Sequence, residues 1–174
     1  MFKKPEDMPL SVLILSVLGL LVFLFLTLSI SLGTRLLALN AYLQLIQFGA
    51  LILTFVAAIQ WGFGLTAAAR QISTPTWWFP TTLLPMILAW LALAIPDPIW
   101  KILLLATGFA TAFLLDTTSH SRGYSPPWYK GLRKFLTLGV LASLMVALLA
   151  TQASLTKESL LHAYIGKKPL LKVS

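Results

Sequence analysis

The sequence predicts an all-α protein that is embedded in a membrane as a bundle of five transmembrane helices. Only 10% of its residues are charged and 58% are hydrophobic, with a mean hydropathy of +0.87, whereas soluble domains carry roughly a quarter charged residues. A soluble fold of 174 residues with this composition would expose large apolar patches. We therefore expect one membrane domain that covers residues 1–174.

Each expected span is an apolar run of about the ~20 helical residues that cross a hydrocarbon core. The five spans cover residues 8–33, 40–66, 78–95, 99–116 and 135–152. The tail, residues 153–174, has Thr156 as an expected N-cap and predicts a short helix that lies in the membrane interface.

Prolines shape the third span and its end. Pro85 lies inside the apolar run and has no N–H to donate to the carbonyl of Thr81, so a kink is expected there. The Pro96-Asp97-Pro98 sequence predicts a tight turn between the third and fourth spans, because neither proline continues a regular helix.

The charges indicate topology and contact with membrane lipids. The net charge of +8 makes this a basic protein, but its Lys and Arg residues are scattered at the ends of apolar runs. This distribution is typical of the positive-inside bias of membrane proteins and does not favour a nucleic-acid partner. The chain has no cysteine, which excludes disulfides and thiolate-held metals.

A polar stripe is expected on the second span. Asn40, Gln44, Gln47 and Thr54 recur at steps of three, four or seven, and Trp61 continues the series, so they share one face of a helix. Amides are costly in hydrocarbon, so we expect this polar intramembrane lining to point into the bundle or a wet cavity. It would serve either hydrogen bonds between helices or the lining of a solute or ligand site. Gln60 lies about 140° from Gln47 around the helix and belongs to another face.

Small residues predict two close helix contacts. Gly108, Ala112 and Asp116 are four residues apart on the fourth span, which places the acid on a close-packing face near the membrane boundary. The fifth span carries a second stripe of small residues, namely Gly139, Ser143, Ala147 and Thr151.

The hydrophilic stretch from Asp116 to Lys134 is where a site is expected. With the N-terminus inside, this stretch shares one membrane face with the end of the second span and the loop before the third. Aromatic residues then gather on that face, namely Trp61, Trp77, Trp78, Trp128 and Tyr129. An ion pair between Asp116 and Arg133 would join the fourth and fifth spans. The candidate functional cluster consists of Gln60, Trp61, Gly62, Asp116, Trp128, Tyr129 and Arg133.

The sequence assigns no catalytic, cofactor-binding or metal site. Asp116 and His120 have the i, i+4 spacing of a proton relay or of one edge of a metal site, but no third ligand is evident. Ser119 adds the residue types of a hydrolytic triad without its geometry. No cofactor is expected.

Four segments in order resemble a known family: QFGALILTFVAAIQWG, LLPMILAWLAL, GFATAFLLD and PPWYKGLRKFLT. They are similar to the transmembrane protein 69 family of bacterial and mitochondrial inner-membrane proteins, a domain of unknown function, between Tyr42 and about Leu149. The matching positions are Trp61, Gly62, Pro85, Trp90, Asp116, Pro127, Trp128, Tyr129 and Arg133. Gln60 departs from the family pattern, in which a His often precedes the Trp, and the first span lacks a Pro-Phe element. The resemblance implies a multi-span inner-membrane protein and supplies no activity.

These features favour a non-enzymatic protein of the bacterial cytoplasmic membrane, or of the mitochondrial inner membrane, with an accessory, assembly or lipid-contacting role. Its expected partners are membrane lipids and either another inner-membrane protein or further copies of itself. One alternative is a carrier or ligand-binding protein for a small solute or proton that uses the polar lining. A second alternative is an enzyme that acts on a lipid or quinone at the aromatic face.

Overall fold

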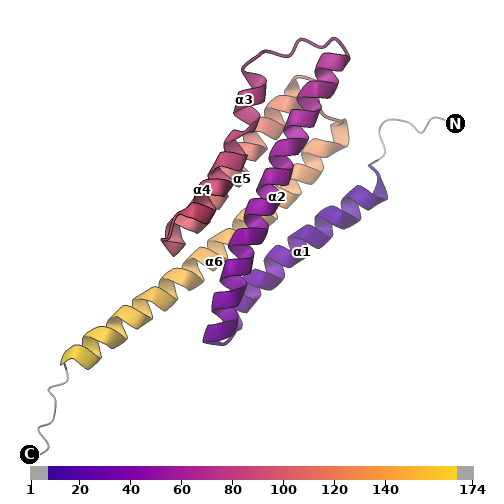
Figure 1. The fold of residues 1–174 in the computed structure, drawn as a ribbon. Helices are drawn as coiled ribbons and strands as arrows, with labels where there is room; N and C mark the ends of the chain where they lie inside the picture. Colours follow the sequence, from indigo (N-terminus) through magenta and orange to yellow (C-terminus); the bar gives the residue numbers. More distant parts are fainter. Residues whose placement is uncertain (1–7, 168–174) are drawn as a thin grey trace, which may run out of the picture.

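Helices joined by short connections make up the part of the chain that the structure describes (Figure 1). The structure is a computed structural model that describes the backbone of residues 8–167 and the side chains of residues 8–157 and 159. The helices are α1 (Leu10–Leu32), α2 (Arg35–Ala69), α3 (Trp78–Thr82), α4 (Leu84–Ala94), α5 (Pro98–Ser121) and α6 (Pro127–Lys167). Every regular element within these residues is helical, as predicted.

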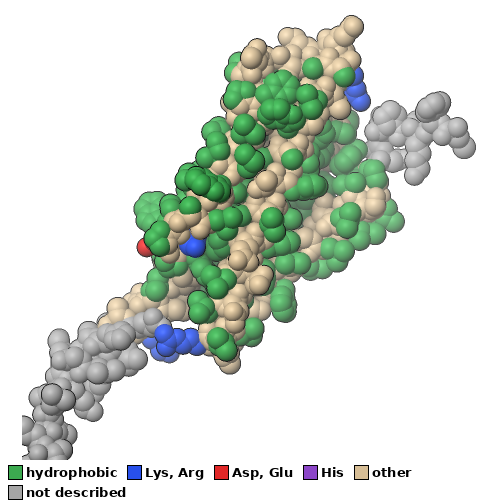
Figure 2. All heavy atoms as spheres, viewed as in Figure 1, with side chains coloured by type: hydrophobic (Ala, Val, Ile, Leu, Met, Phe, Trp, Pro, Cys, Tyr) green, Lys and Arg blue, Asp and Glu red, His purple; other side chains and the backbone are tan. Residues whose placement is uncertain are grey.

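Four of the helices, α1, α2, α5 and α6, are long and apolar enough to cross a membrane. Bulky apolar side chains such as Leu15, Phe25 and Trp90 point outward from the bundle. Figure 2 shows hydrophobic side chains over much of the visible face and only a few charged ones. Such an exterior suits hydrocarbon, where backbone polar groups must be satisfied within the helices.

The third expected span, residues 78–95, is a pair of short helices. The apolar stretch Trp78–Ala94 provides about 25 Å of helix at 1.5 Å per residue, less than the ~30 Å hydrocarbon core. The expected kink is confirmed, because α3 ends at Thr82 and α4 begins at Leu84. At the break the amide of Leu83 turns to the carbonyl of Pro80, and the Thr82 hydroxyl donates to Phe79 O at 2.7 Å.

The α4–α5 turn is built as the prolines predict. α4 ends at Ala94, and α5 begins at Pro98. Asp97 caps α5, because its Oδ1 accepts hydrogen bonds from the backbone amides of Ile99 and Trp100 at 2.9 and 3.0 Å. A charged residue at this turn therefore has a local structural role.

Helices α5 and α6 extend well beyond the expected spans. α5 continues past Asp116 to Ser121, and α6 begins at Pro127, so most of the hydrophilic stretch is helical. The expectation of a separate tail helix is wrong for residues 153–167, because α6 runs through them without a break. Thr156 lies inside α6, and its hydroxyl donates to Gln152 O at 3.0 Å. The rest of that tail, residues 168–174, lies outside the described residues. Hydropathy marks the part of a helix that suits lipid, not the points where the helix begins and ends.

Small residues bring the long helices close together, as predicted. Gly108 of α5 faces Leu53 of α2 so closely that an added Cβ would clash with the leucine side chain. A Cβ at Gly139 of α6 would lie 2.7 Å from Leu20 Cδ1 of α1. The Thr27 hydroxyl of α1 donates to Ser143 O of α6 at 3.4 Å. α5 thus packs on α2, and α6 packs on α1.

The ends of α2 and α5 finish with the same turn. After α2 the amides of Gln71 and Ile72 donate to Ala68 O and Ala67 O, and Gln71 has a φ of 60°. After α5 the amides of Gly123 and Tyr124 donate in the same pattern to His120 O and Ser119 O, and Gly123 has a φ of 72°. Both are Schellman motifs, in which a residue with positive φ closes the helix.

Candidate functional site

A buried polar cluster joins three helices near the end of the bundle where α5 finishes and α6 begins. α2 contributes Gln60, α5 contributes Asp116 and α6 contributes Arg133. Their exposed fractions are 0%, 1% and 7%. Asp116 reaches this position because it continues the close-packing face of Gly108 and Ala112, both of which are buried.

The carboxylate of Asp116 is bonded through both oxygens. Arg133 Nε donates to Oδ2 at 2.6 Å, and Gln60 Nε2 donates to Oδ1. The expected ion pair between Asp116 and Arg133 is therefore present, and Gln60 adds a bond from α2. Removing one partner of such a buried ion pair strongly destabilises the fold, since the other charge is left uncompensated. The cluster can brace the three helices against one another.

Some buried polar atoms near this carboxylate have no hydrogen-bond partner among the described residues. The hydroxyl of Tyr129 lies within interaction range of Asp116 and Gln60. Among the described residues, no hydrogen-bond partner of good geometry meets Tyr129 Oη, Gln60 Oε1 or Arg133 Nη2. These buried atoms keep unused hydrogen-bonding capacity beside the ion pair.

Aromatic side chains gather beside the cluster, as the sequence predicts. Phe63 packs edge-on against Tyr129 with ring centroids 4.9 Å apart, and Trp128 lies 6.0 Å from the same ring. Trp61 packs on Phe79 at 5.1 Å. These contacts bring the end of α2, the start of α3 and the start of α6 together.

Trp78 is completely buried, unlike the tryptophans that typically face the membrane–water interface. Its ring packs at 5.3 Å on that of Tyr124, the residue that follows Gly123 in the turn after α5. The Tyr124 hydroxyl donates to Ser73 O at 2.9 Å, which holds the loop between α2 and α3 against that turn. Reasoning from the sequence missed Tyr124 and Phe63; a glycine just after a helical pattern was the available signal for the turn at Gly123.

The structure divides the predicted functional cluster. Gln60, Asp116, Tyr129 and Arg133 converge, and the ring of Trp128 packs edge-on against that of Tyr129. Trp61 is partly exposed and lies about 100° around α2 from Gln60, and a Cβ at Gly62 would meet no atom within 4 Å.

The expected orientation of the polar lining is wrong. Its four side chains all lie on the exposed face of α2: Asn40, Gln44, Gln47 and Thr54. Apolar positions of α2 such as Leu45 and Leu53 pack inward instead, because they fit against Phe23 and Leu105 across the bundle. The separation of Gln60 from this stripe is confirmed, but Gln60 is the amide that points inward. These side chains therefore line no internal cavity.

Asp116 and His120 have the expected i, i+4 placement, but their side chains are not hydrogen-bonded to each other. α5 is continuous through both residues, so they lie on one side of it. Both oxygens of Asp116, however, are bonded to Gln60 and Arg133, and His120 Nδ1 has no hydrogen-bond partner in the described part of the chain.

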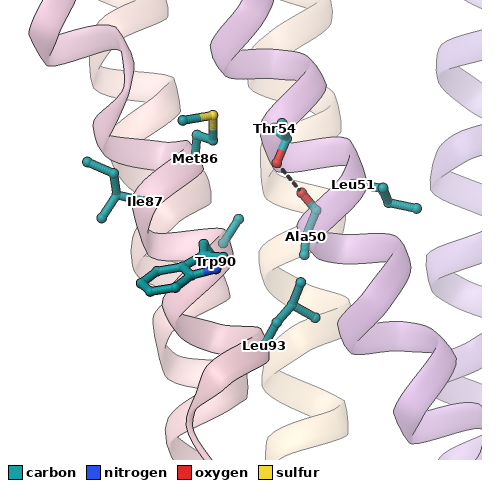
Figure 3. A pocket seen from close by; sticks show the side chains of 8 residues that line it. Ala50, Leu51, Thr54, Met86, Ile87, Trp90 and Leu93 are labelled. Atoms are coloured by element: carbon teal, nitrogen blue, oxygen red, sulfur yellow. Dashed lines mark hydrogen bonds between the residues drawn. The ribbon is translucent and has the colours of Figure 1, made fainter.

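An apolar groove lies between α2 and α4 on the outside of the bundle (Figure 3). It has a volume of about 360 Å³, and Ala50, Leu51 and Thr54 line it from α2, opposite Met86 and Trp90 of α4. A second hollow of about 330 Å³ continues it past Thr54 and Met86 to Trp61, next to the break at Leu83. The Thr54 hydroxyl donates to Ala50 O at 2.9 Å, so the groove presents an apolar lining.

The long apolar helices and the lipid-suited exterior define an integral membrane protein. The chain belongs to the family of transmembrane protein 69, whose family model, described as "Protein of unknown function (DUF3429)", matches residues 8–149. The match includes α1, which lies ahead of the segments that carried the resemblance. Transmembrane protein 69 of Xenopus tropicalis is 30% identical over 154 residues, which cover 84% of this chain. The chain spans 57% of that relative's length. No solved structure matches the chain.

Proposed function

We propose that this protein has a non-enzymatic accessory or assembly role and acts through helix contacts within the membrane. One observation carries the proposal: α2 displays Asn40, Gln44, Gln47 and Thr54 outward. Amides that face lipid are costly, and amides that face another helix form hydrogen bonds. A membrane-embedded partner at this face would remove the cost.

The placement of these amides supports the proposal. The stretch between Arg35 and Arg70 has no charged residue. A hydrocarbon core of ~30 Å centred on it would hold about residues 43–62 at 1.5 Å per residue. Gln44, Gln47 and Thr54 then lie within the core, and Asn40 lies at its edge. Among the described residues no hydrogen bond holds the three amides.

In this proposal the Asp116 cluster is a brace. Both carboxylate oxygens bond to other helices, and the side chains of Gln60 and Asp116 are inaccessible from the surface. The cluster fixes α2 against α5 and α6 and so holds the outward face of α2 in place.

We place the protein in an inner membrane, bacterial or mitochondrial, with α3 and α4 together as the third crossing. The start of α1, the α2–α3 loop and the α5–α6 turn then share the inner side. Arg70, Arg122 and Lys130 lie at that end of the bundle, which agrees with the positive-inside bias. The guanidinium of Arg122 lies 5.1 Å from the centre of the Trp77 ring there.

A second candidate function is the binding of a lipid chain, which the α2–α4 groove favours. Its lining is apolar and it opens on the surface that faces lipid. An acyl or isoprenoid chain has the matching chemistry.

Purification from the native membrane in mild detergent tests both candidates. We expect a stoichiometric membrane protein to accompany the natural chain and to be lost from the Gln44→Leu/Gln47→Leu variant. The exposed Leu24 of α1 provides the control variant Leu24→Ala, which should retain the partner. Mass spectrometry of the same samples would detect a bound lipid. Equal recovery of a partner from natural and variant chains would contradict the accessory role at this face, and recovery of lipid alone would favour the second candidate.

A further inference from the structure

We infer that the partner at the outward face of α2 is a second copy of the same chain, bound side by side in the same orientation. The inference rests on the proposed function and names its partner. The surface concerned, termed the outer seam, consists of Asn40, Gln44, Gln47, Leu51, Thr54, Ala58, Trp61 and Leu65. All eight side chains are exposed.

The spacing of the outer seam is that of a coiled-coil seam. Its positions alternate in steps of four and three residues from Asn40 to Leu65 without interruption. A repeat of 3.5 residues keeps one stripe facing a partner helix over several turns when the two helices wind around each other with a left-handed twist. The stripe lies opposite the buried face of α2 that holds Leu45, Val56 and Gln60.

A second copy in the same orientation places its own polar groups at the same depths in the membrane. Copies of one chain share the same orientation in a membrane, so a two-fold axis along the membrane normal brings each residue of α2 to its own counterpart. An amide carries both donors and an acceptor, so Gln44 and Gln47 can each bond to the same residue of the second copy. A different protein would need polar groups at the same two depths.

Nothing on the seam opposes the approach of an identical surface. Residues 36–69 carry no charge, so two copies meet there without like-charge repulsion. Ala58 is small enough for close approach of the two helices. The hollows beside Leu51, Thr54 and Trp61 offer room for side chains of the second copy.

The outer face of α1 gives no comparable signal. Its exposed side chains from Ile14 to Leu28 are all apolar: Ile14, Leu15, Leu18, Leu21, Val22, Leu24, Phe25 and Leu28. Lipid tails are as apolar as these residues, so this face gains little from a partner. Of these two outer faces, only that of α2 carries amides within the span.

The absence of cysteine from the chain allows a direct test. Single cysteines are placed on the seam by Gln47→Cys and Thr54→Cys. The matched controls are Phe55→Cys, which is exposed on the same helix about 100° from Thr54, and Leu138→Cys on the exposed side of α6. Each full-length variant is oxidised in lipid vesicles at two protein-to-lipid ratios, after a thermal-unfolding check that it is folded.

We expect disulfide-linked dimers from the two seam positions at both dilutions and little from the two controls. Adding Gln44→Leu to the Thr54→Cys chain should weaken the association about tenfold, because the amide bonds of two copies are lost. Absence of dimers at both seam positions would overturn the inference, and so would equal cross-linking at Phe55→Cys. If another protein depends on Gln44 and Gln47 for co-purification while no cross-link forms, the accessory role stands and the second copy is ruled out.

Discussion

Glutamines on one helix have opposite surroundings. Gln60 is fully buried and donates to a carboxylate of α5, whereas Gln44 and Gln47 are exposed without a hydrogen bond to the described part of the chain. The inward amide is paired within the protein, and the outward amides lack an equivalent partner in a setting where polar groups are costly. One face of α2 therefore packs within the bundle, and the opposite face is the one proposed here for association.

The largest effect should come from the charged brace on the inward side. Asp116→Leu leaves the Arg133 guanidinium buried without its counter-charge and should lower the free energy of unfolding by about 3 to 5 kcal/mol. Unfolding in mixed detergent micelles measures the loss. The double variant Asp116→Leu/Arg133→Met removes both charges and should recover much of the stability. A double variant as unstable as the single one would contradict the assignment of the ion pair as the cause.

The two kinds of glutamine should respond differently to the same substitution. Gln60→Leu removes a bond to a charged group and should cost about 1.5 to 3 kcal/mol of stability. Gln47→Leu should change the stability of the dispersed monomer by less than about 0.5 kcal/mol, as exposed substitutions usually do. Chemical unfolding of both variants under identical detergent conditions checks the difference, and equal losses would erase the distinction between the faces.

Two glycines of α2 extend the comparison to packing. A Cβ at Gly64 would lie 2.8 Å from the buried ring of Trp78, so Gly64→Ala should destabilise the fold by about 1 to 3 kcal/mol. Gly62→Ala is the matched control, because no atom lies within 4 Å of its added Cβ. Alanine favours the helix, so this variant should be neutral or more stable by up to about 1 kcal/mol. Thermal unfolding that ranked Gly62→Ala below Gly64→Ala would refute the packing of α3 on α2.

The smallest effect is expected where α2 ends. Gln71 has a φ of 60°, a conformation that costs glycine little, so Gln71→Gly should raise stability by up to about 1 kcal/mol. Gly123→Ala at the equivalent position after α5 should lower it by a similar amount. A shift of the melting temperature in the same direction for both variants would contradict the equivalence of the two turns.

The sequence was sufficient for features governed by periodicity and by single residues. The steps of four predicted the buried face of Gly108, Ala112 and Asp116, and charge complementarity predicted the partner Arg133. Pro85 predicted the break near Leu83. Each of these depends on geometry within one helix or on a pair of opposite charges.

The sequence was insufficient where one face of a helix had to be chosen over another. It placed Gln60 and Gln47 on separate faces but assigned the inward role to Gln47. In a membrane the exterior is as apolar as the core, so hydrophobicity does not distinguish the two faces. The deciding contact was the carboxylate of Asp116, which lies 56 residues away from Gln60 in the chain. Hydrophobicity also gave the wrong helix ends, because α6 continues beyond its apolar part.

Counting copies of the chain in a bilayer measures self-association through the outer seam. The full-length protein, labelled with one fluorophore and diluted in lipid vesicles, should bleach in two steps. The Gln44→Leu/Gln47→Leu variant should bleach mainly in one step with unchanged thermal stability. Single-step bleaching of the natural chain, or two-step bleaching that the double variant leaves unaltered, would contradict the assignment of the outer seam to self-association.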